Sequence, residues 1–192
     1  MLIKDILKIS CVILNSDEVL TYLTDNVYEN EDVIKESELL FKCFNLVINE
    51  LSSEYLPFKD VKTLNTPDGI INYALLDNKV TDILSVKNGA GENMDFSAYP
   101  LYIKINAGAA GAAGSVTVEY SYIPEFQSVS GEVNIGEKKI TERIIAYGIC
   151  AEYCLICGQY DEALIWDKRY KDSLASVMRK TKRLSVPARS WN

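Results

Sequence analysis

Histidine is absent from the 192 residues of this chain. The absence excludes Ser–His–Asp triads, His–Cys dyads, His-ligated zinc and any histidine general base. An enzyme built on this sequence would have only carboxylate, lysine or cysteine chemistry to use. We find no set of residues with a catalytic pattern and expect a non-enzymatic protein.

Long apolar runs are missing as well. No stretch approaches the roughly 18 uninterrupted apolar residues that a membrane span needs, and residues 1–5 lack the layout of a signal peptide. We therefore expect a soluble chain, made in the cytosol and without membrane contact. With 48% hydrophobic and 24% charged residues, the chain can bury one core or two small ones.

Cysteine is present in an odd number, at Cys11, Cys43, Cys150, Cys154 and Cys157. The last three match the C-x3-C-x2-C pattern that holds a [4Fe–4S] cluster in radical enzymes, where a loop wraps the cluster. Here the flanking sequence is helical, and positions i, i+4 and i+7 form one stripe on a helix. We predict reduced thiols packed at a helix–helix contact, with no metal or cofactor, and keep a cysteine-ligated iron–sulfur protein as a remote alternative.

The spacing of apolar residues predicts helices at both ends of the chain and β-strands in its middle. Apolar residues recur at three- and four-residue steps in residues 1–56, with a break near Asn15, and again in residues 140–157 and 160–184. Between them, β-branched and aromatic runs alternate with turn residues. This pattern predicts an α+β fold: a helical bundle of residues 1–56 and 138–185, a small antiparallel β subdomain of residues 57–137, and an extended tail of residues 186–192.

A run of small residues, 106–115, contains Gly108, Gly111 and Gly114. It lies between predicted strands 101–105 and 116–123, so we expect a hairpin with a long mobile tip. The run lacks the Gly-Lys-Ser/Thr ending of a phosphate-binding loop and precedes a strand rather than a helix. A flexible loop, or a small-residue finger that fits against a neighbour or into a channel, is the expectation here.

Charge is strongly segregated along the chain. The net charge is −7, yet the last 25 residues carry eight basic side chains and one acidic one, which leaves −14 for residues 1–167. An acidic body with a basic end favours head-to-tail contact with further copies or with a larger assembly, although a solvated basic helix would look the same.

The basic end supplies the candidate docking residues. Lys180, Lys182 and Arg183 suit a protein interface, a solvated helix end or a nucleic-acid patch, and these readings stay open. Arg189 and Trp191, after Pro187, are the residue types enriched at interface anchors. Four nearby carboxylates, Glu142, Glu152, Asp161 and Glu162, are better explained by helix ends and i,i+4 pairs than by catalysis.

The second half of the chain contains five distinctive runs, VEYSYIP at 118–124, YGICAEYCL at 147–155, GQYDEA at 158–163, WDKRYK at 166–171 and PARSW at 187–191. In these runs it resembles the head–tail connector (adaptor) proteins of tailed bacteriophages, in particular the tail tubular protein A group. The likeness extends from about Val116 to the end and is architectural before that.

The resemblance implies a virion structural protein at the head–tail junction. Such adaptors form a ring, usually dodecameric, under the portal protein. The next tail protein docks on that ring. Double-stranded DNA passes through the ring with transient, non-specific contact. The family has no catalytic residues to carry over. We expect docking roles for Lys180, Arg183, Pro187, Arg189 and Trp191, and a tail-terminator or head-completion protein is the alternative.

Overall fold

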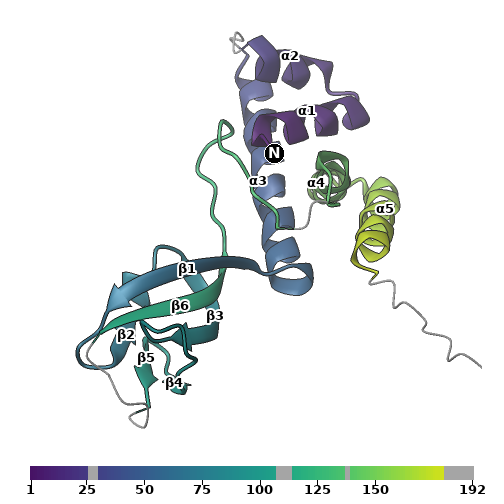
Figure 1. The fold of residues 1–192 in the computed structure, drawn as a ribbon. Coiled ribbons are helices and arrows are strands. Elements are labelled where there is room, and N and C mark those ends of the chain that lie inside the picture. Colours follow the sequence, from purple (N-terminus) through teal and green to yellow (C-terminus); the bar gives the residue numbers. More distant parts are fainter. Residues whose placement is uncertain (26–29, 107–113, 137–138, 180–192) are drawn as a thin grey trace, which may run out of the picture.

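The computed structural model describes residues 1–25, 30–106, 114–136 and 139–179. Helices from both ends of the chain lie together, and the strands form a separate region beside them (Figure 1). The predicted α+β fold class is therefore confirmed.

The first helices follow the predicted apolar stripe. Helix α1 spans Ile3–Leu14, α2 spans Asp17–Asp25 and α3 spans Glu31–Glu50. Asn15 ends α1 in the left-handed conformation with φ of 56°, which a short polar side chain tolerates. Asn30 caps α3 because its side chain accepts a hydrogen bond from the Asp32 amide at 3.0 Å. A π-helical turn, η1 (Leu51–Tyr55), extends α3 to just before Pro57.

Helices α4 (Glu142–Ile156) and α5 (Tyr160–Met178) form an antiparallel hairpin that turns at Gly158, with φ of +77°. Helix α4 packs against both α1 and α3, and its buried side includes Ile145 and Ile149. Helix α5 packs chiefly on α4, mainly through Ala163, Tyr170 and Leu174, and lies at the outside of the helical part (Figure 1). The chain's N- and C-terminal helices therefore share one core.

The β region has a core of its own. Its elements are β1 (Phe58–Asn65), β2 (Ile70–Asn72), the 3-10 turn η2 (Tyr73–Leu75), β3 (Lys79–Lys87), β4 (Phe96–Ala98), β5 (Tyr102–Ile105) and β6 (Ser115–Ile123). Strands β1, β6 and β3 form one antiparallel sheet, and β2, β5 and β4 form another. Both sheets contribute to the same apolar core, with Val116, Val118 and Tyr120 of β6 alternating inward.

The predicted hairpin across residues 106–115 is wrong. Strands β5 and β6, which flank it, belong to different sheets, so the small-residue run connects two sheets instead of closing a hairpin. Strand β2 stops at Asn72, where the chain changes to a 3-10 turn, because the Asn72 side chain accepts a hydrogen bond from the Ala74 amide. The short strand β4 had no sequence signal strong enough to predict it.

Residues 124–136 return from the sheets to the helices. The Phe126 ring contacts the Phe44 ring of α3 at 5.5 Å, and the Asn45 side chain exchanges two hydrogen bonds with the Phe126 backbone. Val133 and Ile135 then enter the helical core. By its packing, this part of the expected β subdomain lies with the helical bundle.

The last helix is shorter than the predicted range to residue 184. Helix α5 ends at Met178, and Arg179 leaves the helical conformation with φ of −58° and ψ of 99°. Residues 180–192 lie outside the described part of the chain. No helix within the described ranges combines the length and apolar character required to cross a membrane.

Candidate interaction surface

Most of the predicted docking residues lie outside the described ranges. This applies to Lys180, Arg183, Pro187, Arg189 and Trp191, and also to Gly108 and Gly111 of the small-residue run. Gly114 is described and directly precedes β6; among the described residues other than its chain neighbours, no atom lies within 4 Å of the position where a Cβ would stand. The docking roles therefore stay predictions.

Two of the three clustered cysteines pack as predicted and one does not. Cys150 and Cys154 are buried in α4, whereas Cys157 caps the helix and is exposed. Burial raises the pKa of the Cys150 thiol to about 12, as it does for Cys11 and Cys43. Within residues 1–25, 30–106, 114–136 and 139–179, no group of three or more cysteine or carboxylate side chains is arranged to hold a metal ion. The prediction of three packed cysteines is thus wrong for Cys157.

The candidate carboxylates mostly occupy helix starts. Glu142 lies in the first turn of α4, and Asp161 and Glu162 lie in the first turn of α5, where negative charge interacts favourably with the helix dipole. The i,i+4 pair in this region joins Asp167 to Lys171 at 3.0 Å. These positions agree with helix-end roles.

One side of the α4–α5 hairpin is held by stacked side chains. The Tyr147 ring stacks on the Trp166 ring with centroids 5.6 Å apart and an interplanar angle of 22°. The guanidinium of Arg143 lies 5.5 Å from the Tyr147 centroid, and that of Arg169 lies 4.9 Å from the Trp166 centroid. Such contacts each contribute about 0.5–1 kcal/mol at exposed sites. They fix the two helices as one unit that can present a defined surface.

A hollow of about 400 Å³ runs between the two helices near their turn. We call it the α4–α5 groove, and its lining consists of Ala151, Glu152, Leu155, Tyr160, Ala163, Leu164, Asp167 and Lys171. Tyr160 and Leu164 stand one helical turn apart on α5, and Leu155 faces them from the last part of α4. The middle of the groove is therefore apolar, with charged residues towards its edges.

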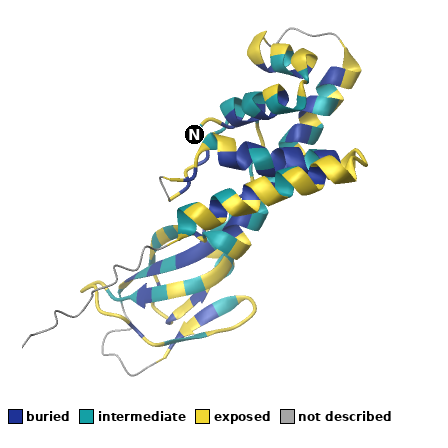
Figure 2. Ribbon diagram, turned by 90° about the vertical axis from the view of Figure 1, so that its right-hand side faces the viewer, coloured by how far each residue is buried: buried dark blue, intermediate teal, exposed yellow. Residues whose placement is uncertain are grey.

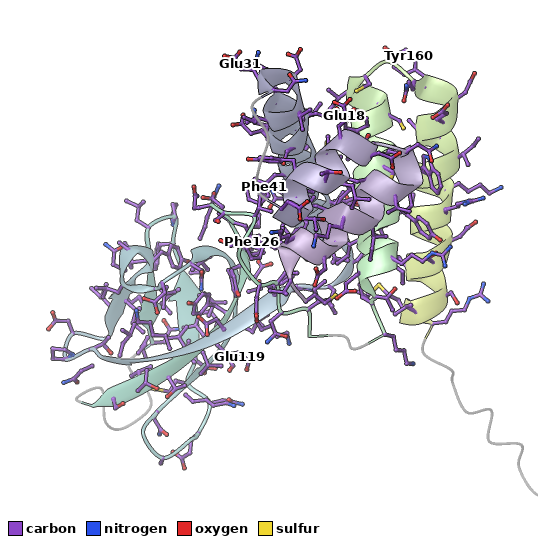
Figure 3. All side chains as sticks on the ribbon, turned by 90° about the horizontal axis from the view of Figure 1, so that it is seen from above. Glu18, Glu31, Phe41, Glu119, Phe126 and Tyr160 are labelled. Atoms are coloured by element: carbon purple, nitrogen blue, oxygen red, sulfur yellow. The ribbon has the colours of Figure 1, made fainter. Side chains whose placement is uncertain are left out.

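Large apolar side chains are open to solvent in and beside this groove. Leu164 is 68% exposed and Tyr160 65% exposed, and Leu155, Ile156 and Ile165 are each at least half exposed. Figure 2 views the molecule from the α5 side and shows exposed residues along the outward face of this helix. Figure 3 shows Tyr160 at the end of the hairpin far from Glu119 of the β region. A concentration of exposed apolar residues on one element is typical of an interaction surface.

Negative charge surrounds the groove. Glu152 and Asp167 are part of its lining, and Asp161 and Glu162 line an adjoining hollow at the helix turn. Among the described residues of the lining, the base is Lys171, and its ammonium group is paired with Asp167. A partner for this surface would combine apolar side chains with positive charge.

Sequence reasoning missed this groove, although a signal for it exists. The helical spacing of α5 places Ala163, Trp166, Tyr170, Leu174, Val177 and Met178 on one apolar face, and the pair Leu164–Ile165 lies outside that face. More apolar residues than one face can hold indicate a second covered surface on a helix.

Comparison of the chain with models of known protein families and with curated proteins finds no match in either case.

Proposed function

We propose that this chain is a structural subunit of a phage head–tail connector ring. In this role it joins the portal protein to the next tail protein within the virion and lets double-stranded DNA pass. The sequence resemblance supplies the identity of the assembly, including its dodecameric symmetry, and the surface described above supports a role in assembly.

The observation that carries the proposal is the exposed apolar surface of the α4–α5 hairpin. Leu155, Tyr160 and Leu164 together would be an unfavourable surface for a lone soluble chain, because each large side chain left in water forgoes about 1.5–3 kcal/mol of burial. A ring subunit covers such a surface with its neighbour. Ring closure requires two different complementary surfaces on each subunit, and the separation of acidic body and basic end provides opposite charges for them.

The acidic body also suits a DNA channel. Residues 1–167 carry a net charge of −14. Carboxylates that face a lumen repel the phosphate backbone, so DNA would slide without being held. If neutralising the lumen carboxylates left DNA ejection unchanged, this part of the proposal would be refuted.

Negative-stain imaging of the purified chain tests the proposal, alone and mixed with the portal protein of its phage. We expect rings in solution, or monomers that become rings on the portal. A chain that stays monomeric and ignores both the portal and the tail protein would contradict the connector function.

A further inference from the structure

The α4–α5 groove needs an occupant with two properties. Its apolar centre, formed by Leu155, Tyr160 and Leu164, needs apolar side chains, and its acidic edges need positive charge. The acids at or next to the groove are Glu152, Asp161, Glu162 and Asp167, and the single lining base is already paired.

The last residues of the chain have this composition. Residues 180–192 contain the bases Lys180, Lys182, Arg183 and Arg189 and no acidic side chain. Their apolar side chains include Leu184, Val186, Pro187 and Trp191. Four bases would therefore face Glu152, Asp161 and Glu162, while Asp167 is paired with Lys171. An aromatic anchor matches the apolar groove, which is the arrangement of an interface hot spot inside a charged rim.

The segment is long enough to reach a groove on another subunit. The twelve residue steps from Arg179 to Trp191 span up to about 40 Å when extended. For comparison, the fifteen steps from Leu164 of α5 to its C-cap Arg179 cover about 22 Å.

The end of α5 directs the chain away from its own groove. The groove lies near the start of α5, and the segment leaves from the opposite end of this helix. To return, the chain would have to reverse after Arg179, which has left the helical conformation, and residues 180–192 contain no glycine to favour a tight turn. Pro187 further favours extended backbone at Val186.

We infer that the α4–α5 groove of one copy binds residues 180–192 of a neighbouring copy, with Trp191 and Arg189 as the anchor. The inference rests on the proposed function, since it names the contact that links successive subunits of the ring. The contact is head-to-tail, because each copy contributes its groove on one side and its C-terminal segment on the other.

Full-length variants test the groove and the C-terminal segment one at a time. Leu164→Arg places a positive charge in the groove, and Arg189→Glu with Trp191→Ala removes the anchor. Leu101→Arg is the matched control, because Leu101 in the β region is 72% exposed against 68% for Leu164. We expect the groove variant and the anchor variant each to weaken self-association more than about tenfold in sedimentation velocity, and the control to assemble as the unmodified chain does.

A mixture of the two defective variants gives the decisive result. The Leu164→Arg chain keeps its C-terminal segment, and the Arg189→Glu/Trp191→Ala chain keeps its groove. One intact contact can therefore form between them, and we expect a one-to-one dimer that grows no further. A mixture that stays monomeric would overturn the assignment of the segment to the groove of a neighbouring copy.

Other outcomes distinguish this inference from the proposed function. If the unmodified chain forms rings and both variants form them equally well, the groove contact is refuted while the connector function stands. If the anchor variant loses binding to a labelled DNA duplex but assembles normally, the segment binds DNA and the inference is refuted. If the unmodified chain neither self-associates nor assembles on the portal, the proposed function falls as well.

Discussion

Gly148 is the residue at which helix packing is tightest. A Cβ at this position in α4 would lie 2.8 Å from one Val47 methyl carbon, 3.1 Å from the other and 3.2 Å from the Tyr170 ring. These distances are shorter than van der Waals contact permits, so α4, α3 and α5 meet here because residue 148 has no side chain.

Gly148→Ala should therefore lower the free energy of unfolding by about 1–2 kcal/mol, since crowding costs more than the roughly 1 kcal/mol that alanine adds in a helix. In a Val47→Ala background both Val47 contacts are removed and the Tyr170 contact remains, so the same substitution should destabilise the protein by clearly less. Urea denaturation of the unmodified chain, the two single variants and the double variant completes a double-mutant cycle, which measures the coupling energy between residues 148 and 47. Equal effects of Gly148→Ala in both backgrounds would contradict the packing described.

The cysteines should differ sharply in reactivity. Cys11, Cys43, Cys150 and Cys154 are buried, and burial raises their thiol pKa, whereas Cys157 is exposed. Because the thiolate is the reactive form, we expect iodoacetamide at pH 8 to modify one thiol per native chain rapidly and the other four only on unfolding. Cys157→Ser should abolish the fast phase. Rapid modification of several thiols would show that the cysteine environment differs from this description.

At the residue scale, the sequence predicts which side chains are buried better than it predicts the residue at which a helix ends. The pattern of Cys150, Cys154 and Cys157 indicates one stripe only if α4 continues through all three residues. The turn at Gly158 ends the helix just before Cys157, so the stripe is cut at its last member. Groove residues such as Leu164 are harder still to assign, because exposure depends on which face the rest of the chain covers.

At the scale of elements, α3 and α5 meet at a charged, partly buried site. Glu50, the last residue of α3, has its carboxyl pKa raised above the ordinary 4.5, chiefly by burial and further by Glu54, Asp167 and Glu152, with Lys171 opposing the shift. The folded state therefore binds the Glu50 proton more tightly than the unfolded chain does. Its contribution to stability declines as pH rises through 4.5 and the folded-state pKa.

Glu50→Gln should consequently stabilise the protein at pH 7, by about 0.5 kcal/mol because the site is partly solvated, and should lose this advantage below pH 4.5. Thermal unfolding at pH 7 and pH 4 compares the two chains. Glu38→Gln, an exposed position on the same helix, is the control and should change little at either pH. If Glu50→Gln raised the unfolding temperature more at pH 4 than at pH 7, the prediction would be contradicted.

The order of elements was largely predictable, whereas strand pairing was not. Apolar spacing predicts α1, α2, α3, α4 and the start of α5 because these helices bury one face each. Strands β5 and β6 look like a hairpin because they are consecutive with a small-residue connection. Tertiary packing instead places β6 between β1 and β3, where its inward residues complete the shared core. The spacing of apolar residues along the chain does not predict such non-local strand pairing.

At the scale of the whole molecule, charge and apolar exposure are unevenly distributed, as the proposed assembly requires. The exposed apolar groove lies on the outermost helix hairpin, away from the β region (Figures 1 and 3). The basic residues are concentrated after the end of that hairpin. A contact between such oppositely charged surfaces weakens as salt screens it, whereas the apolar part of the contact does not.

The mass of the full-length chain in solution, measured over a range of protein concentration and salt, tests the central claim most directly. The account predicts a closed assembly of defined size, and dissociation as salt rises or when residues 186–192 are deleted. A single species of 21.5 kDa at every concentration, with or without the portal protein, would contradict it.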